Sequence, residues 1–225
     1  MSADSEARLR REICEAGRLL HRQNLVAATD GNISARLGPN RFLCTPSGVS
    51  KGRMKPKDLI VADEQGRKVR GHGKVTSEFF THLAAYEERP DIQAVVHAHP
   101  PAAVAFTLAG HSLEAYTLPE VVYTLGAIPT AAYATPGTPE GADSIREWIR
   151  RCDAVLMDRH GALTTGASVM DACLKMEKLE HACYTLLLAH GLGRPRELDA
   201  TQIARLKRLR VDYGVSGKAW FPDEN

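Results

Sequence analysis

Apolar residues recur along this chain at two spacings, one typical of helices and one typical of strands. Within residues 5–23, apolar side chains return every three or four positions while arginines and glutamates fill the other face, which predicts an amphipathic helix. Shorter apolar segments bounded by Gly, Pro, Ser and charged residues predict strands instead. The predicted strands are residues 41–45, 58–62, 92–99 and 154–157. Residues 159–166 carry a turn into a further strand, whereas residues 29–36 are broken up by turn-forming residues.

Capping signals and periodicity predict further helices. Ser77 is expected to cap a helix that runs to about Glu88 and carries Glu78 in its first turn. Thr138 is expected to cap another, which runs to about Arg151. The remaining predicted helices are residues 102–108, 168–190 and 200–211. Because short strands alternate with substantial helices, we expect a mixed α/β fold of the α+β type, with one central sheet in a single domain over residues 1–225.

The composition narrows the possible classes of protein. Twenty-nine Lys and Arg against 27 Asp and Glu leave a formal net charge of +2, so charge offers no argument for binding nucleic acid or an anionic membrane. The first residues lack the apolar segment of a signal peptide, and no apolar run approaches the roughly 20 residues of a membrane helix, so a cytoplasmic protein is expected. The five cysteines include no C-x-x-C pair. A metal site would therefore have to use histidine and carboxylate ligands.

The segment His97-Ala98-His99 is the strongest local candidate for chemistry. On a strand, residues two apart project from the same face about 7 Å apart, so both imidazoles can reach one metal ion. Two histidines on a solvated face are the alternative. The apolar residues before them predict a strand that is buried on both faces, where unpaired imidazoles would be costly. This favours metal binding.

A tetrahedral metal ion needs more ligands than these two histidines. His160, which lies between an apolar strand and Gly161, is the candidate third histidine, although a histidine before a glycine is also typical of a turn. Glu78 is the candidate carboxylate, and its alternative role is to complement the dipole of the helix that it begins.

Three loops combine small residues, free backbone N–H groups and side-chain donors, as oxyanion sites do. They contain Asn32, Ser47-Gly48 and Thr76-Ser77. The last of them also precedes an expected helix N-terminus, where phosphate groups commonly bind. Each loop alone is equally typical of a turn or a helix cap.

Six motifs follow one another in an order and approximate spacing that resembles the class II aldolase/adducin family. They are Thr29-Asp-Gly-Asn-Ile-Ser-Ala-Arg36, Thr45-Pro-Ser-Gly48, Thr76-Ser-Glu78, Val95-Val-His-Ala-His-Pro100, Tyr133-Ala-Thr-Pro-Gly-Thr138 and Arg159-His-Gly161. The resemblance covers about residues 8–190, is closest to the L-fuculose-1-phosphate aldolases, and leaves the C-terminal helix and tail, 199–225, outside it.

The resemblance implies both an architecture and a site. It implies a nine-stranded, mostly antiparallel sheet flanked by helices, and a C4 homotetramer with active sites at subunit boundaries. It implies that His97, His99 and His160 bind zinc, or manganese or cobalt in its place. Glu78 would join them in the resting site and move off to act as the acid/base. The implied phosphate-binding residues are Asn32, Ser47, Gly48, Thr76 and Ser77.

The resemblance also implies a reaction. The related ribulose-phosphate 4-epimerases carry Asp where this chain has Glu78, so it favours reversible cleavage of a ketose-1-phosphate, similar to L-fuculose-1-phosphate, into dihydroxyacetone phosphate and an aldehyde. One alternative is dehydration, as in the methylthioribulose-1-phosphate dehydratases of the same superfamily. Another is a non-catalytic, adducin-like interaction module, and the intact set of candidate metal ligands speaks against it.

One part of the family pattern is not matched. In fuculose-phosphate aldolases, a tyrosine of the neighbouring subunit protonates the aldehyde oxygen, and here the corresponding stretch is 116–123, in which neither tyrosine is in register. Tyr116 and Glu120 are the candidate second proton donors. Tyr213, in the C-terminal segment, is a further residue that could cover a site.

Overall fold

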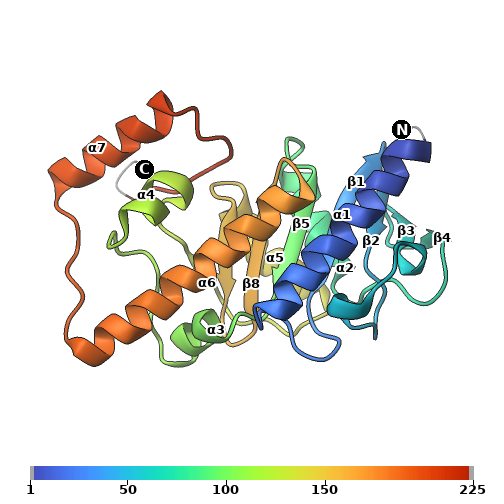
Figure 1. Ribbon diagram of the computed structural model, residues 1–225, viewed down its shortest axis with the longest axis horizontal. Coiled ribbons are helices and arrows are strands. Elements are labelled where there is room, and N and C mark those ends of the chain that lie inside the picture. The colour runs from blue at the N-terminus through green and yellow to red at the C-terminus, as the bar shows by residue number, and fades with distance from the viewer. Residues whose placement is uncertain (1–2, 223–225) are drawn as a thin grey trace.

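A mixed β-sheet runs through the molecule, with helices on both of its faces (Figure 1). The computed structural model describes residues 3–222, so residues 1–2 and 223–225 of the predicted domain lie outside the described residues. Eight strands form the sheet in the order β4-β3-β2-β1-β5-β8-β7-β6. They are β1 (Asn32–Gly38), β2 (Arg41–Cys44), β3 (Ile60–Asp63), β4 (Lys68–Arg70), β5 (Ala94–Ala98), β6 (Thr130–Ala131), β7 (Ala154–Met157) and β8 (Gly161–Gly166).

Neighbouring strands are antiparallel except β6 and β7, which are parallel. The predicted α+β class and mostly antiparallel sheet are therefore confirmed. Where the resemblance implied nine strands, the sheet has eight within residues 3–222. None of the described helices combines the length and the apolar character of a membrane-spanning helix.

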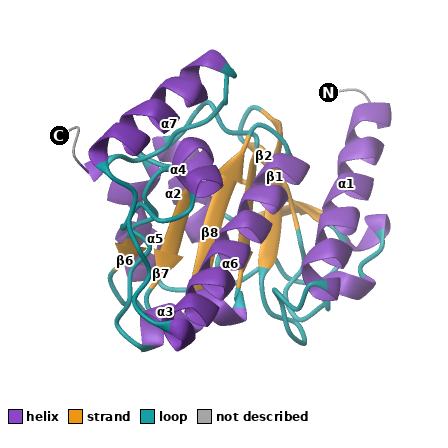
Figure 2. Ribbon diagram, turned by 60° about the vertical axis from the view of Figure 1, so that its left-hand side comes forward, coloured by secondary structure: helices purple, strands orange, loops and turns teal. Residues whose placement is uncertain are grey.

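Seven α-helices and two short 3₁₀ helices surround the sheet in the described part of the chain. They are α1 (Ala3–Arg22), η1 (Lys51–Arg53), η2 (Pro56–Asp58), α2 (Phe79–Glu88), α3 (Pro101–Leu108), α4 (Pro119–Leu125), α5 (Pro139–Ile149), α6 (Val169–Leu192) and α7 (Ala200–Asp212). Helices α1, α3 and α6 cover one face of the sheet, while α2 and α5 cover the other (Figure 2). Helices α4 and α7 pack together at one end of the molecule (Figure 1).

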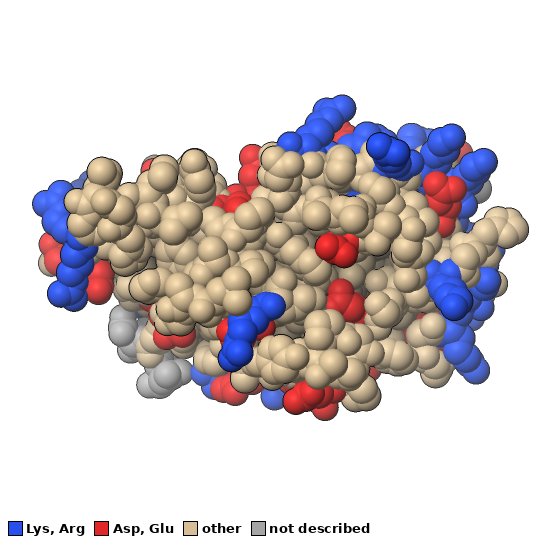
Figure 3. Space-filling view, turned by 90° about the horizontal axis from the view of Figure 1, so that it is seen from below, with Lys and Arg blue, Asp and Glu red and all other residues tan. Residues whose placement is uncertain are grey.

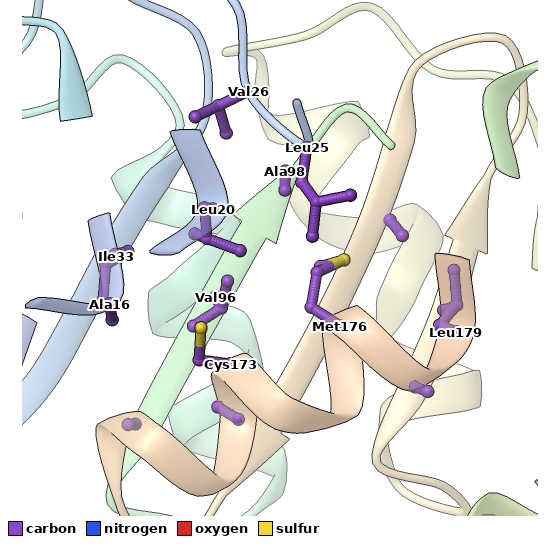
Figure 4. Close-up of a cluster of buried hydrophobic side chains, with 14 of the residues drawn as sticks. Ala16, Leu20, Leu25, Val26, Ile33, Val96, Ala98, Cys173, Met176 and Leu179 are labelled. Atoms are coloured by element: carbon purple, nitrogen blue, oxygen red, sulfur yellow. The ribbon is translucent and has the colours of Figure 1, made fainter. Parts of the chain in front are cut away.

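Strand β5 is the central element of the core, and every one of its residues is buried. Its alternate side chains enter different layers, as the pleat requires. Val96 meets Leu20 of α1 and Met176 of α6 on one face (Figure 4). Val95 packs with residues of α2 on the other face, and His97 projects to that same side. The strand thus aims one imidazole at the start of α2.

Several predicted elements form with small shifts of their ends, and others were missed. The prediction that Ser77 caps this helix is wrong. Glu78 itself occupies the N-cap position of α2, and its side chain makes no capping hydrogen bond. Strand β1 lies largely in the segment for which turns were predicted. The prediction failed because the strand carries polar residues, such as Ser34, that are buried in the fold. Helix α4 and the exposed strand β4 have no clear apolar pattern and were not expected.

Candidate metal centre

The pairing of β5 with β8 brings the three candidate histidines together. His97 lies on β5, His99 follows the end of that strand, and His160 lies in the turn between β7 and β8. The two strands are antiparallel with Ala98 opposite Ala162, so the end of β5 lies beside the start of β8. Glu78, at the start of α2, completes the group.

The side-chain donors of these four residues converge. One ligand atom from each lies within 4.8 Å of the others. The Nε2 atoms of His97 and His99 are 3.0 Å apart, and the two Glu78 oxygens lie 3.2 Å from Nε2 of His97 and 3.2 Å from Nε2 of His160. Ligands about 2.0–2.1 Å from a tetrahedral ion are about 3.3 Å from one another, so these spacings fit a metal site.

The outward-facing nitrogen of the His97 ring fixes which nitrogen that imidazole presents to the cluster. The Nδ1–H group of His97 donates to the carbonyl oxygen of Ala162 over 3.0 Å, and Nδ1 of His99 lies 3.7 Å from Oδ2 of Asp30. Metal-bound histidines commonly direct their second ring nitrogen at a carbonyl or carboxylate in this way. With its Nδ1 bonded to the Ala162 carbonyl, His97 presents Nε2 to His99 and Glu78, where a cation could take the place of a shared proton. The donor set therefore fits a divalent ion.

The charges inside the cluster perturb one another. Burial raises the pKa of Glu78, but His97 and His160 outweigh burial and hold that pKa well below its usual range. Burial lowers the pKa of His97, and Glu78 more than reverses this effect. Burial together with His97 and His160 lowers the pKa of His99 to about 4, so its imidazole is neutral at pH 7. An ionised carboxylate thus lies among the three imidazoles.

Gly161 makes room for the cluster rather than turning the chain. The left-handed backbone conformation that the turn requires belongs to Arg159, whose φ is 56°. A Cβ added to Gly161 would lie 2.3 Å from the carbonyl oxygen of Ala98, 3.0 Å from Cδ2 of His99 and 3.2 Å from Cε1 of His97. A glycine is therefore needed here because the end of β5 and both imidazoles lie against it.

The three loops with oxyanion-type donors lie side by side near this cluster. Pro46 and Val75 form an antiparallel bridge, so Ser47-Gly48 lies next to the segment that leads into Thr76, Ser77 and Glu78. Gly48 is exposed and has a φ of +70°, in the left-handed region that glycine adopts easily.

Asn32, the third donor position, is the first residue of β1 and is tied directly to the cluster. Its Nδ2 donates to Oε2 of Glu78 over 2.9 Å, and its Oδ1 lies 2.5 Å from Nε2 of His82. Both ends of the Asn32 amide are therefore engaged within the protein. His82 has no partner at a metal-ligand spacing in the sequence, and the structure buries it completely.

Lys51 is a second residue near the cluster that was not expected there. Its side chain is buried, and its Nζ donates to the carbonyl oxygens of Thr29 and Val49 over 2.6 and 2.8 Å. Burial lowers the pKa of Lys51 to about 8, and Asp30 and Glu78 offset part of that effect. The ammonium group thus joins two of the three donor loops. Nothing in the sequence around Lys51 signals that it is buried.

The surface around this edge carries few other cations. In Figure 1 the loop after α1 and helix α3, which flank the cluster in the chain, lie along the lower edge of the molecule. Viewed from below, lysine and arginine side chains gather toward the two ends and leave the middle mostly without them (Figure 3). Arg159, which precedes His160 in the chain, is an exposed basic residue here, whereas Lys51 is a buried one.

The structure does not bring the candidate second proton donors into this cluster within one chain. Tyr116 is 9% exposed and packs against Phe221 beside Val122. Glu120 is exposed in the first turn of α4, and Tyr213 is exposed at the end of α7. All three belong to the α4–α7 end of the molecule.

Comparisons with known proteins agree with this fold and cluster. A family model described as the class II aldolase and adducin N-terminal domain matches residues 11–187. Methylthioribulose-1-phosphate dehydratase of Methylococcus capsulatus is 36% identical over 197 residues, which cover 81% of this chain and 95% of the relative. The 3-oxo-tetronate 4-phosphate decarboxylase of Haemophilus influenzae is 30% identical over 198 residues, which cover 86% of this chain and 93% of the relative.

A solved structure is similar over a comparable length. The crystal structure of L-fuculose-1-phosphate aldolase from Thermus thermophilus matches with a TM-score of 0.74 and 34% sequence identity, covering 84% of this chain and 100% of that one. The family model spans the donor loops, both halves of the histidine cluster and Glu78. This chain therefore belongs to the class II aldolase and adducin family.

Proposed function

We propose that the protein is a metal-dependent lyase that reversibly cleaves a ketose-1-phosphate, similar to L-fuculose-1-phosphate, into dihydroxyacetone phosphate and an aldehyde. One observation carries the proposal: the three donor loops meet at the edge where three histidines and Glu78 converge. A phosphate group and a carbonyl-polarising ion would then be held next to each other, as a phosphorylated ketose requires.

We propose zinc as the resident ion, with manganese or cobalt able to take the same ligands. His97, His99 and His160 would hold it, with Glu78 as the fourth ligand of the resting site. A bound divalent ion supplies Lewis-acid polarisation of the substrate carbonyl. The three imidazoles and one carboxylate suit zinc because it takes nitrogen and oxygen ligands in tetrahedral geometry.

The donor loops would bind the substrate phosphate. The backbone N–H of Gly48 and the hydroxyl groups of Ser47, Thr76 and Ser77 are donors of the type that phosphate oxygens accept, and Asn32 has a second N–H beside the one that it gives to Glu78. Lys51 would add the positive charge that these neutral donors lack. Its position between two of the loops supports this role.

Glu78 would exchange a proton with the carbon next to the substrate carbonyl. Cleavage of the C3–C4 bond removes the proton of the C4 hydroxyl group, turns C4 into an aldehyde and leaves an electron pair at C3. Glu78, displaced from its place among the histidines by the bound substrate and protonated from solvent, would deliver a proton to C3, which completes dihydroxyacetone phosphate. Its position beside the donor loops, in a partly desolvated site, supports such acid/base work.

The proton on the C4 oxygen would be handled by a neighbouring subunit of a homotetramer. Of the two candidates, we favour Glu120, because it is exposed on α4 whereas Tyr116 is buried within its own chain. Glu120 also lines a groove of about 620 Å³ between α4 and α6, together with Leu174 and Lys178. This groove gives a second copy of the chain a surface to contact.

Dehydration of a sugar phosphate is the second candidate function. It is supported by the 36% identity with a methylthioribulose-1-phosphate dehydratase over 95% of that relative. In that reaction a proton leaves C3 and hydroxide leaves C4, so water is released and the carbon chain stays intact. The same Glu78 and the same proton donor would serve both reactions.

Metal analysis combined with a screen of ketose-1-phosphates tests the proposal. Release of dihydroxyacetone phosphate, followed with glycerol-3-phosphate dehydrogenase and NADH, supports the aldolase. A dicarbonyl phosphate without dihydroxyacetone phosphate supports the dehydratase instead. Protein that contains no metal and turns over none of the substrates would favour a non-catalytic interaction module.

Glu78→Gln separates metal binding from chemistry. The amide keeps the shape and one oxygen donor, so the variant should retain metal while turnover falls by about 10²–10⁴-fold, the range expected when a general acid/base is lost. Bound metal is measured by mass spectrometry and turnover by the product assay. A metal-loaded variant with full activity would refute the acid/base role.

A further inference from the structure

A row of buried hydrogen bonds leads from the interior of the protein to Glu78. Tyr86 and Ser34 are joined through their hydroxyl groups over 2.9 Å, and the Ser34 hydroxyl lies 2.6 Å from Nδ1 of His82. On the other side of that ring, Nε2 lies 2.5 Å from Oδ1 of Asn32, whose Nδ2 reaches Glu78 over 2.9 Å. The four residues before Glu78 are all at most 3% exposed, so water cannot replace these contacts.

The direction of every hydrogen bond in this row follows from its last member. An ionised carboxylate only accepts, so the amide nitrogen of Asn32 must face Glu78 and the amide oxygen must face His82. The Nε2 atom of His82 must then carry the hydrogen. Burial lowers the pKa of His82 to about 3, so the ring is neutral and its Nδ1 accepts a hydrogen bond.

The hydrogen bonds of Ser34 and Tyr86 point in the same direction. The Ser34 hydroxyl donates to Nδ1 of His82, and the Tyr86 hydroxyl therefore donates to Ser34. All donors point toward the metal cluster. Hydrogen bonds aligned in one direction polarise and strengthen one another. The opposite tautomer of His82 would turn the Asn32 amide over and place its oxygen against the Glu78 carboxylate, where the two oxygens repel.

We propose that His82 is a positioning residue for the metal site, which selects the orientation of the Asn32 amide and thereby holds the Glu78 carboxylate among the histidines. The inference rests on the proposed role of Glu78 as a metal ligand and acid/base. It adds a residue that is not itself a candidate metal ligand and that acts on Glu78 only through Asn32. A histidine with only a structural role could satisfy its two ring nitrogens in either tautomer, whereas the positioning role requires the hydrogen to be on Nε2.

Two measurements test this role without any substrate. Nitrogen-15 NMR of the histidine-labelled, metal-free protein reports the tautomer of His82, and we expect a slowly exchanging Nε2–H. Zinc affinity, measured by competition with a chromophoric chelator, reports how well Glu78 is held. His82→Phe should weaken zinc binding by about 10-fold, the lower end of the range for losing a partner of a metal ligand, because His82 acts on Glu78 through Asn32.

Two matched variants separate positioning from general stability. His82→Gln can donate to Asn32 and accept from Ser34 with its amide, so it should restore most of the zinc affinity. Tyr86→Phe removes a buried hydroxyl from the far end of the same row on the same helix, so it should lower the melting temperature without changing zinc affinity.

An Nδ1–H tautomer of His82 in the wild-type protein would overturn the proposal, and this result does not depend on any variant folding. Wild-type zinc affinity in His82→Phe would also overturn it. Neither measurement uses turnover, so the absence of aldolase or dehydratase activity would refute the proposed function and leave these two results to decide the role of His82.

Discussion

Replacing Gly161 by alanine tests whether close packing sets the geometry of the metal cluster. The new Cβ would lie 2.3 Å from the Ala98 carbonyl oxygen, and contacts below 3.0 Å are essentially absent from real proteins, so β5 and β8 must separate by about 0.7 Å. Metal–ligand distances tolerate only about 0.2 Å. Because His97 and His99 are on one side of that contact and His160 is on the other, the separation spreads the ligands.

The expected result is a large loss of zinc affinity, by about 100-fold, together with a loss of about 1–3 kcal/mol in the free energy of unfolding, the usual cost of overpacking. Zinc affinity is measured by chelator competition. Urea unfolding of the metal-free protein isolates the packing cost, because bound metal would itself add stability.

Gly191→Ala is the matched control. Gly191 lies in α6, and a Cβ added there meets nothing within 4 Å. Alanine should stabilise the helix by about 0.5–1 kcal/mol and leave zinc affinity unchanged. If Gly161→Ala bound zinc as tightly as the wild type, the contact between β5 and this glycine would not control the ligand geometry, and the reasoning would be refuted.

Two further predictions concern the substrate side of the site. Lys51→Met should weaken binding of inorganic phosphate by roughly tenfold or more, as expected when a charged hydrogen bond is lost. Lys55→Met removes an exposed charge nearby and should leave phosphate affinity unchanged. Calorimetry measures the phosphate affinity of both variants. Since the pKa of Lys51 is lowered to about 8, its ammonium is lost as the pH rises above that value, so wild-type phosphate affinity should fall there, and an identical pH profile in Lys51→Met would contradict the role. Glu120→Gln and Glu78→Gln should each be inactive, yet mixed oligomers of the two should regain activity because some boundaries unite both intact residues; no recovery would assign the second proton donor to another residue.

The elements that could be predicted from the sequence are those whose signal is local. The spacing of Ile13, Ala16 and Leu20 predicts α1, because a helix brings residues three and four apart to one face. The His97-Ala98-His99 segment predicts two imidazoles on one side of a strand for the same kind of reason. Ser168 caps α6 as such residues do, through a hydrogen bond to the backbone of Asp171.

Other features could not be predicted because they depend on partners that are distant in the sequence. Ser34 makes β1 look like a turn, and only its contact with His82 and Tyr86 satisfies that buried hydroxyl. The sequence does not distinguish Lys51 from a surface lysine, because the carbonyl groups that accept its hydrogen bonds belong to two loops that only the fold brings together.

The candidate metal-binding cluster likewise has a part that follows from the sequence and a part that follows from the fold. The sequence alone determined that two histidines share one face of β5, since the pleat of a strand requires it. The register of β5 against β8 decided that His160 joins them, and the packing of α2 against the sheet decided that Glu78 faces all three. Gly161 needs to be a glycine only because that register presses the two strands together. Local geometry follows from neighbouring residues in the chain, whereas the register and the packing arise from burial summed over the whole core.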